Sequence, residues 1–131
     1  RLDDTGTRVP LIVNWPSVIK PGSSTDALID MADFFPTSMQ LAGAKVDQPT
    51  DGISFLPVLH GKSHKRTWAY SEHRAKWWVR DQRYKLHHDG KFVEVSQALP
   101  GKETEIKGKR TAEQQRAFEK LKAAKPHATG R

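Results

Sequence analysis

The stretch RVPLIVNWP, residues 8–16, decides how the rest of this chain is interpreted. Five of its nine residues are apolar, and a proline stands near each end. This pattern predicts one buried strand with a defined start and a defined end. Apolar residues on both faces of a strand are typical of parallel sheets that helices cover on each side. The stretch therefore predicts an inner strand of an α/β sheet.

Several further motifs follow this stretch in a fixed order. They are DFFPT (33–37), LAG (41–43), DGISFLPVLHG (51–61), WAYSE (68–72), RYKL (83–86) and DGKF (89–92). The order resembles the C-terminal third of the formylglycine-dependent sulfatases, the arylsulfatase-like branch of the alkaline phosphatase superfamily. The resemblance covers about residues 4–96, and its specificity lies in the order of the motifs.

The resemblance and the local patterns together predict two parts. Residues 1–62 are expected to be the end of an α/β main domain of the alkaline-phosphatase/sulfatase type, and residues 63–131 a C-terminal α+β subdomain. In the second part, alternating large and small residues predict a small antiparallel sheet over 67–96. A polar loop (97–110) and one packed helix (111–124), started by a capping box of Thr111 and Gln114, follow it.

In the first part, residues 26–32 are predicted to be extended. Asp33 is predicted to cap a short helix, and Gly43 to close it. Gly52 allows a positive φ before the apolar turn 53–59. A catalytic role for Asp33 is the less favoured alternative.

Composition suggests part of a longer protein. The 131 residues suffice for one domain, but only 36% are apolar, the mean hydropathy is -0.71, and the sequence starts at Arg1. No run approaches the length of a membrane span. The absence of cysteine excludes a disulfide framework and a thiolate metal site in this sequence. The net charge of +7 raises the hypothesis of polyanion binding, although a solvated surface is the simpler interpretation and nucleic acid is not favoured as a partner.

The resemblance also implies chemistry that this sequence does not carry. Family members use a formylglycine, made from Cys or Ser in a C/S-x-P/A-x-R motif, beside a calcium ion. No such motif occurs here. We therefore expect no catalytic residue and no metal ligand in this chain, and no hydrolysis by it alone. Calcium and formylglycine are implied for the parent enzyme, and the implied partner is the remainder of the sulfatase chain. A metal site at His87, His88 and Asp89 is not favoured, because neighbouring strand residues diverge.

The best candidate for substrate contact is the segment between two predicted strands that holds His73, Arg74, Lys76 and Trp77. Cations suit the charge of a sulfated sugar or aryl sulfate, and an indole covers a ring face. In the alternative interpretation, Trp77 and Trp78 point to opposite faces of a strand and one of them packs under the helix.

The sequence thus predicts the C-terminal part of a sulfatase acting on aryl or carbohydrate sulfate esters. One alternative is a phosphoesterase or phosphonate hydrolase of the same superfamily, and another is a basic polyanion-binding module. The resemblance implies a periplasmic or secreted parent.

Overall fold

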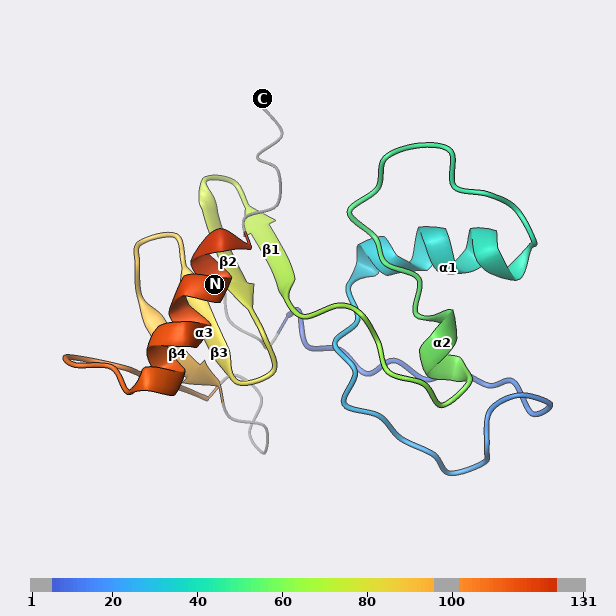
Figure 1. Cartoon of the computed structure of the whole chain (residues 1–131), viewed down its shortest axis with the longest axis horizontal. Coiled ribbons are helices and arrows are strands. Elements are labelled where there is room, and N and C mark those ends of the chain that lie inside the picture. The colour runs from blue at the N-terminus through green and yellow to red at the C-terminus, as the bar shows by residue number, and fades with distance from the viewer. Residues whose placement is uncertain (1–5, 96–101, 125–131) are drawn as a thin grey trace. The chain divides into compact units, whose positions relative to one another are not determined.

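The computed structural model describes residues 6–95 and 102–124 of the 131 (Figure 1). The chain divides into two compact units. One runs from Leu11 to Thr67, and the other joins the N-terminal residues up to Pro10 with the segment from Trp68 onward. Each unit is described by itself below.

The second unit is built on a five-stranded antiparallel sheet in which each strand pairs with the next one along the chain. Its strands are β1 (Ala69–His73), β2 (Lys76–Arg80), β3 (Tyr84–His87), β4 (Phe92–Val95) and β5 (Glu103–Glu105). Helix α3 (Ala112–Ala123) lies across one face of this sheet (Figure 1). The predicted antiparallel sheet with one packed helix is confirmed.

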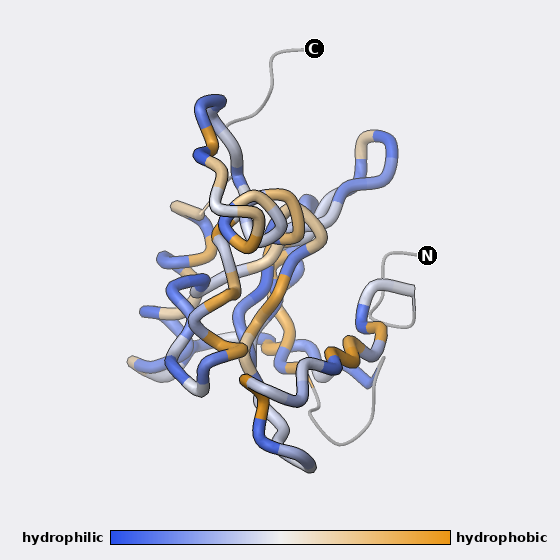
Figure 2. Tube along the Cα trace, turned by 90° about the vertical axis from the view of Figure 1, so that its right-hand side faces the viewer, coloured by the Kyte–Doolittle hydropathy of each residue, from blue (hydrophilic) through white to orange (hydrophobic). Residues whose placement is uncertain are grey.

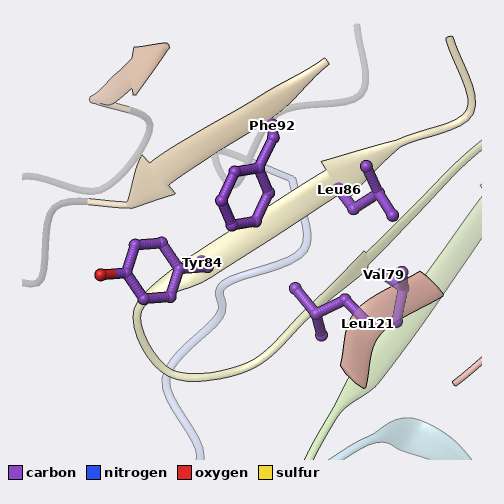
Figure 3. Close-up of a cluster of buried hydrophobic side chains, with 5 residues drawn as sticks. All are labelled: Val79, Tyr84, Leu86, Phe92 and Leu121. Atoms are coloured by element: carbon purple, nitrogen blue, oxygen red, sulfur yellow. The ribbon is translucent and has the colours of Figure 1, made fainter. Parts of the chain in front are cut away.

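The core of this unit lies between the sheet and α3. Figure 3 shows the five buried side chains at its centre, which are Val79, Tyr84, Leu86, Phe92 and Leu121. Strand alternation places the first four on one face of the sheet, and Leu121 reaches them from the helix. Burial of side chains of this size stabilises a fold by roughly 1.5–3 kcal/mol each. The sheet therefore has the covered face that a small sheet needs.

The N-terminus of α3 has the predicted capping box. The Thr111 hydroxyl accepts a hydrogen bond from the Gln114 N–H (3.2 Å), and the Gln114 side chain accepts one from the Thr111 N–H (2.9 Å). The capping box is confirmed.

Strand β5 corrects the prediction of an uninterrupted loop over 97–110. Glu103–Glu105 pairs with β4, and the Glu103 carboxylate lies 2.5 Å from Lys85 Nζ. The strand is polar and short, so it has no hydrophobic period that sequence analysis detects. A neighbouring strand edge and a buried cation specify it instead.

The first unit contains three short helical elements: η1 (Met31–Asp33), α1 (Phe34–Leu41) and α2 (Leu56–Leu59). The extended segment predicted for 26–32 holds only in part, because its last two residues belong to η1. Gly43 closes α1 with a φ of 69°, as predicted.

The buried strand predicted for residues 8–16 is not formed. Leu11, Ile12 and Val13 are 43%, 89% and 38% exposed, and no strand is assigned to this stretch. A strand needs a neighbouring strand to satisfy its N–H and C=O groups, and none of the described strands pairs with this stretch. The apolar pattern is present without the partner that it requires.

The predicted role of Asp33 in this unit is wrong. Asp33 makes no side-chain cap to α1, and Asp30 caps the preceding turn instead. Gly52 does not use the positive φ that glycine allows. A Cβ at position 52 would clash with the Ala32 carbonyl oxygen, so glycine is required there by close backbone approach.

Candidate functional site

The predicted site residues lie at the closed end of the β1–β2 hairpin. Arg74 and Ala75 form the turn, and His73 faces Lys76 across the two strands. Arg74 has a φ of 58°, a left-handed conformation that is uncommon for a residue with a Cβ. His73, Arg74 and Lys76 are all exposed. The hairpin thus presents three basic or titratable side chains to solvent.

The fourth predicted residue, Trp77, belongs to the opposite face of the hairpin. Its ring stacks on Tyr70 with a centroid separation of 6.2 Å and packs against the core under α3. Trp78, its neighbour, is buried on the other face. The structure therefore brings His73 and Lys76 together and separates them from Trp77, because successive strand residues alternate between faces.

A hydrogen bond joins two side chains of β1 on the Trp77 face. The Tyr70 hydroxyl donates to Glu72 (2.8 Å). Partial burial and this carboxylate raise the pKa of Tyr70 to about 12, so the phenol stays protonated at neutral pH.

Two further residues, His88 and Lys91, lie at the same end of the sheet and were not predicted as substrate contacts. The turn between β3 and β4 lies beside the β1–β2 turn, and the His88 N–H donates to the Trp77 carbonyl (2.9 Å). This contact brings the exposed His88 and Lys91 to the end of the sheet that carries Arg74 and Lys76. Alternate turns of a meander lie at the same end of the sheet. Once a meander is predicted, this rule places the β3–β4 turn at the end of the sheet that carries the β1–β2 turn.

One carboxylate moderates the charge of this end. Asp89 accepts a hydrogen bond from the Lys91 N–H (3.0 Å), which lowers the pKa of that carboxyl and keeps it ionised. We name the exposed group of His73, Arg74, Lys76, His88 and Lys91 the cationic end of the sheet.

The face of the sheet opposite α3 holds a buried cation that sequence analysis also missed. Lys85 is fully buried, is paired with Glu103, and its Nζ lies 4.9 Å from the centre of the Trp78 ring. His87 lies nearby, with Nε2 3.6 Å from Glu103. Burial lowers the pKa of His87, so its ring is neutral at pH 7. This group supports the strands that carry the cationic end.

The first unit is organised around a second buried ion pair. Asp33 is fully buried and accepts hydrogen bonds from Arg66 Nε (2.7 Å), from the other guanidinium nitrogen of Arg66 and from the Ile53 N–H (2.7 Å). Burial alone would raise the pKa of Asp33, but these donors together hold the pKa below its usual value. The pair therefore joins the end of η1, directly before α1, to the segments around residues 53 and 66.

Neither a cluster of metal ligands nor a membrane-spanning helix occurs among the described residues. Within residues 6–95 and 102–124, no three histidine or acidic side chains gather as metal ligands. None of the helices in the described part of the chain has both the length and the apolar character to cross a bilayer.

Comparison with known proteins supplies the family. A model of the family described as "N-sulphoglucosamine sulphohydrolase, C-terminal" matches residues 2–102. The chain belongs to this sulfatase C-terminal family. The match includes the cationic end of the sheet and the Asp33–Arg66 pair, and it ends before α3.

Individual relatives are also sulfatases. The chain is 40% identical over 111 residues to an ulvan-active sulfatase of Formosa agariphila, covering 76% of this chain and 22% of the relative. It is 35% identical over 94 residues to an N-acetylglucosamine-6-O-sulfatase of Bacteroides thetaiotaomicron (62% and 17%). A 62-residue match to human steryl-sulfatase is 44% identical (46% and 11%). The chain thus spans about a fifth or less of the curated relatives it matches, and the predicted resemblance to the C-terminal part of sulfatases is confirmed.

Proposed function

We propose that this sulfatase C-terminal chain works as part of an enzyme that hydrolyses aryl or carbohydrate sulfate esters. The observation that carries the proposal is the family match over residues 2–102, together with relatives that are themselves sulfatases. The fold supplies a scaffold, and the cationic end of the sheet supplies a surface for an anionic substrate.

The reacting groups are proposed to lie outside these 131 residues. The sequence has no cysteine, and none of its serines begins an S-x-P/A-x-R motif. The described residues offer no cluster of ligands that suits calcium. The nucleophile and metal implied by the family therefore do not fit this chain, and by itself it is expected to hydrolyse nothing.

The contribution proposed for this chain is the rim of the substrate pocket. Arg74 and Lys76 are exposed and fixed on a hairpin, and an arginine fork matches two oxygens of a sulfate group. His88 and Lys91 extend the same surface for a substrate with a second anionic group. Trp77 holds the hairpin from the other face and presents its partly exposed indole to a sugar or aryl ring.

Sulfatase activity is tested with the native gene product and matched sulfate and phosphate esters of one alcohol. We expect hydrolysis of the sulfate ester, a formylglycine in the product, and no turnover by the 131-residue chain alone. Preferred turnover of the phosphate ester would replace the proposal with the phosphoesterase alternative. Salt-sensitive polyanion binding without hydrolysis by the native product would favour the binding module suggested by the net charge of +7.

The rim is tested separately by the double variant Arg74→Gln/Lys76→Gln in the native product. We expect KM for a sulfated oligosaccharide to rise about tenfold with little change in kcat, because the two cations contact the substrate away from the reacting bond. The double variant Arg116→Gln/Lys122→Gln removes the same charge from exposed positions of α3 and serves as the control. Equal KM values for the two double variants would remove the rim from the proposal.

A further inference from the structure

Two aromatic side chains lie next to each other on one face of the β1–β2 hairpin. Glu72 stands directly opposite Trp77 in the strand register, and Tyr70 lies two residues before Glu72, so the three side chains share this face. The rings of Tyr70 and Trp77 are diagonal neighbours across the two strands, with their centroids 6.2 Å apart and their planes inclined by 28°. The two rings therefore form one nearly continuous aromatic surface.

The core holds this aromatic pair in place and leaves it partly open. Both rings pack against the buried cluster around Val79, and both are half-buried. Helix α3 packs on β3 and β2, and β1 is an edge strand, so the pair lies at the border of the covered face. Rings that are fixed in this way lose little side-chain freedom when a ligand binds to them.

This aromatic surface differs in character from the hydrophobic surface of the chain. Among the described residues, the exposed large apolar side chains all lie between positions 9 and 41, and hydrophobic stretches of the trace are orange in Figure 2. Tyrosine and tryptophan rings instead combine an apolar face with a polar group. They suit a ligand that is itself partly apolar and partly polar.

A carboxylate stands at the edge of the aromatic pair. Glu72 is exposed and accepts a hydrogen bond from the Tyr70 hydroxyl (2.8 Å). An ionised carboxylate offers about four acceptor sites, so others remain for the hydroxyl groups of a ligand. Its negative charge repels a sulfate group at the same place. The surface therefore suits a ring that carries hydroxyl groups and no charge, which describes an unsulfated sugar and not a simple aryl sulfate.

We propose that Tyr70, Glu72 and Trp77 form a binding subsite for an uncharged sugar unit of a carbohydrate whose sulfate ester the parent enzyme hydrolyses. The inference rests on the proposed function and deepens it, because it names a carbohydrate and not an aryl sulfate as the substrate. Lys76 directly precedes Trp77, and His73 directly follows Glu72, so the cationic end begins beside this subsite. Sulfated units of the same carbohydrate therefore have a separate surface, whose charge is opposite to that of Glu72.

The difference in KM between a long and a short substrate tests the subsite. The native gene product is assayed on sulfated oligosaccharides released from algal and animal polysaccharides, and on the monosaccharide that carries the same sulfate ester. For the oligosaccharide with the highest kcat/KM, we expect a KM about tenfold lower than that of the monosaccharide, because only the longer substrate reaches the subsite. Trp77→Ala should remove this advantage, and Trp77→Phe, which keeps an aromatic face, should retain most of it. Equal KM values for the two substrates in the native product overturn the inference.

Glu72→Ala tests the subsite without disturbing the core, because Glu72 is exposed. We expect it to reduce the KM advantage of the oligosaccharide by about threefold, through the loss of hydrogen bonds to sugar hydroxyl groups. Glu119→Ala removes the same charge from an exposed position of α3 and is the control. If Glu72→Ala and Glu119→Ala retain the same KM advantage, the inference is overturned.

Activity and binding separate the failure of this inference from the failure of the proposed function. Hydrolysis of para-nitrophenyl sulfate without hydrolysis of any sulfated oligosaccharide leaves the sulfatase activity and overturns the subsite. If the native product hydrolyses no sulfate ester, the proposed function fails, and the dissociation constants of the same oligosaccharides decide the subsite. Weaker binding by Trp77→Ala and Glu72→Ala than by Glu119→Ala then supports the subsite, and equal binding by all three variants, or no binding, overturns it.

Discussion

The sheet β1–β5 and helix α3 cover their large apolar side chains, whereas the unit of residues 11–67 leaves many of its own exposed. In the sheet unit, five buried side chains from three strands and one helix form a core. In the unit of residues 11–67, a buried ion pair between Asp33 and Arg66 connects segments that lie far apart in the sequence. Apolar packing stabilises one unit and a hydrogen-bonded charge pair stabilises the other, so substitutions are expected to affect the two units separately.

The largest effect that we expect comes from Arg66→Ala. It leaves Asp33 buried without its main partner, and breaking a buried pair in this way costs about 3–5 kcal/mol. The Ile53 amide, which donates to Asp33, then exchanges much faster, while amides of β3 do not. Arg83→Ala is the control, because Arg83 makes exposed ion pairs with Glu94 and Glu113 and its loss should have little measurable effect. Equal effects of the two substitutions would contradict the contrast between the units.

A slightly smaller effect is expected from Leu121→Ala in the sheet unit. Leu121 is fully buried, and removing a buried leucine side chain typically costs 2–5 kcal/mol through lost packing and the cavity left behind. Denaturant unfolding followed by tryptophan fluorescence measures the loss. The exposed neighbour substitution Lys122→Ala should change the free energy of unfolding by less than about 0.5 kcal/mol. If the Ile53 amide responds to Leu121→Ala as strongly as β3 does, the units are not independent.

Acid should open the unit of residues 11–67 through Asp33. Its pKa is lower in the folded chain than in the unfolded chain, where an aspartate titrates near about 3.9. The stabilisation by this carboxylate is therefore present above about pH 3.9 and is lost as pH falls through the folded pKa. NMR titration of the Ile53 amide shift should follow this loss. A folded pKa of Asp33 above about 3.9 would show that burial outweighs the hydrogen bonds.

The smallest effect is expected from Arg74→Gly at the cationic end. A residue with a Cβ in the left-handed conformation costs about 1–2 kcal/mol, and glycine removes this cost while gaining entropy in the unfolded chain. The net result should be a stability gain of about 0.5–1 kcal/mol, measured by thermal unfolding. Ala75→Gly, at the neighbouring turn position without a positive φ, should lose stability instead. A loss for Arg74→Gly would mean that the arginine side chain makes contacts that outweigh its backbone strain.

Local patterns explain what the sequence predicted correctly. The alternation in β1–β4, the Thr111–Gln114 capping box and Gly43 at the end of α1 all depend on residues that are close along the chain. The candidate site residues His73, Arg74 and Lys76 also come from one short segment, and their contact with a substrate stays a prediction. Their shared exposed position at a hairpin end follows from the turn between two strands.

The misses have long-range causes. Strand β5 is polar, and its partner Lys85 lies 18 residues earlier in the sequence. Asp33 was predicted to cap a helix, because an aspartate directly before a helix is usually its N-cap. Its carboxylate instead accepts hydrogen bonds from Arg66, which lies 33 residues away in the sequence. His88 and Lys91 join the cationic end only because the sheet is a meander.

The sequence by itself determined the family, the antiparallel sheet with its helix, and the absence of a cysteine nucleophile, because each of these is written in the order or identity of nearby residues. The tertiary structure decided which charges are buried, why Gly52 must be glycine, and which apolar residues stay exposed. These properties depend on what lies within a few ångströms in space. Residues 8–16 illustrate the difference, since an apolar pattern specifies that a strand can form and only a neighbouring strand allows it to form.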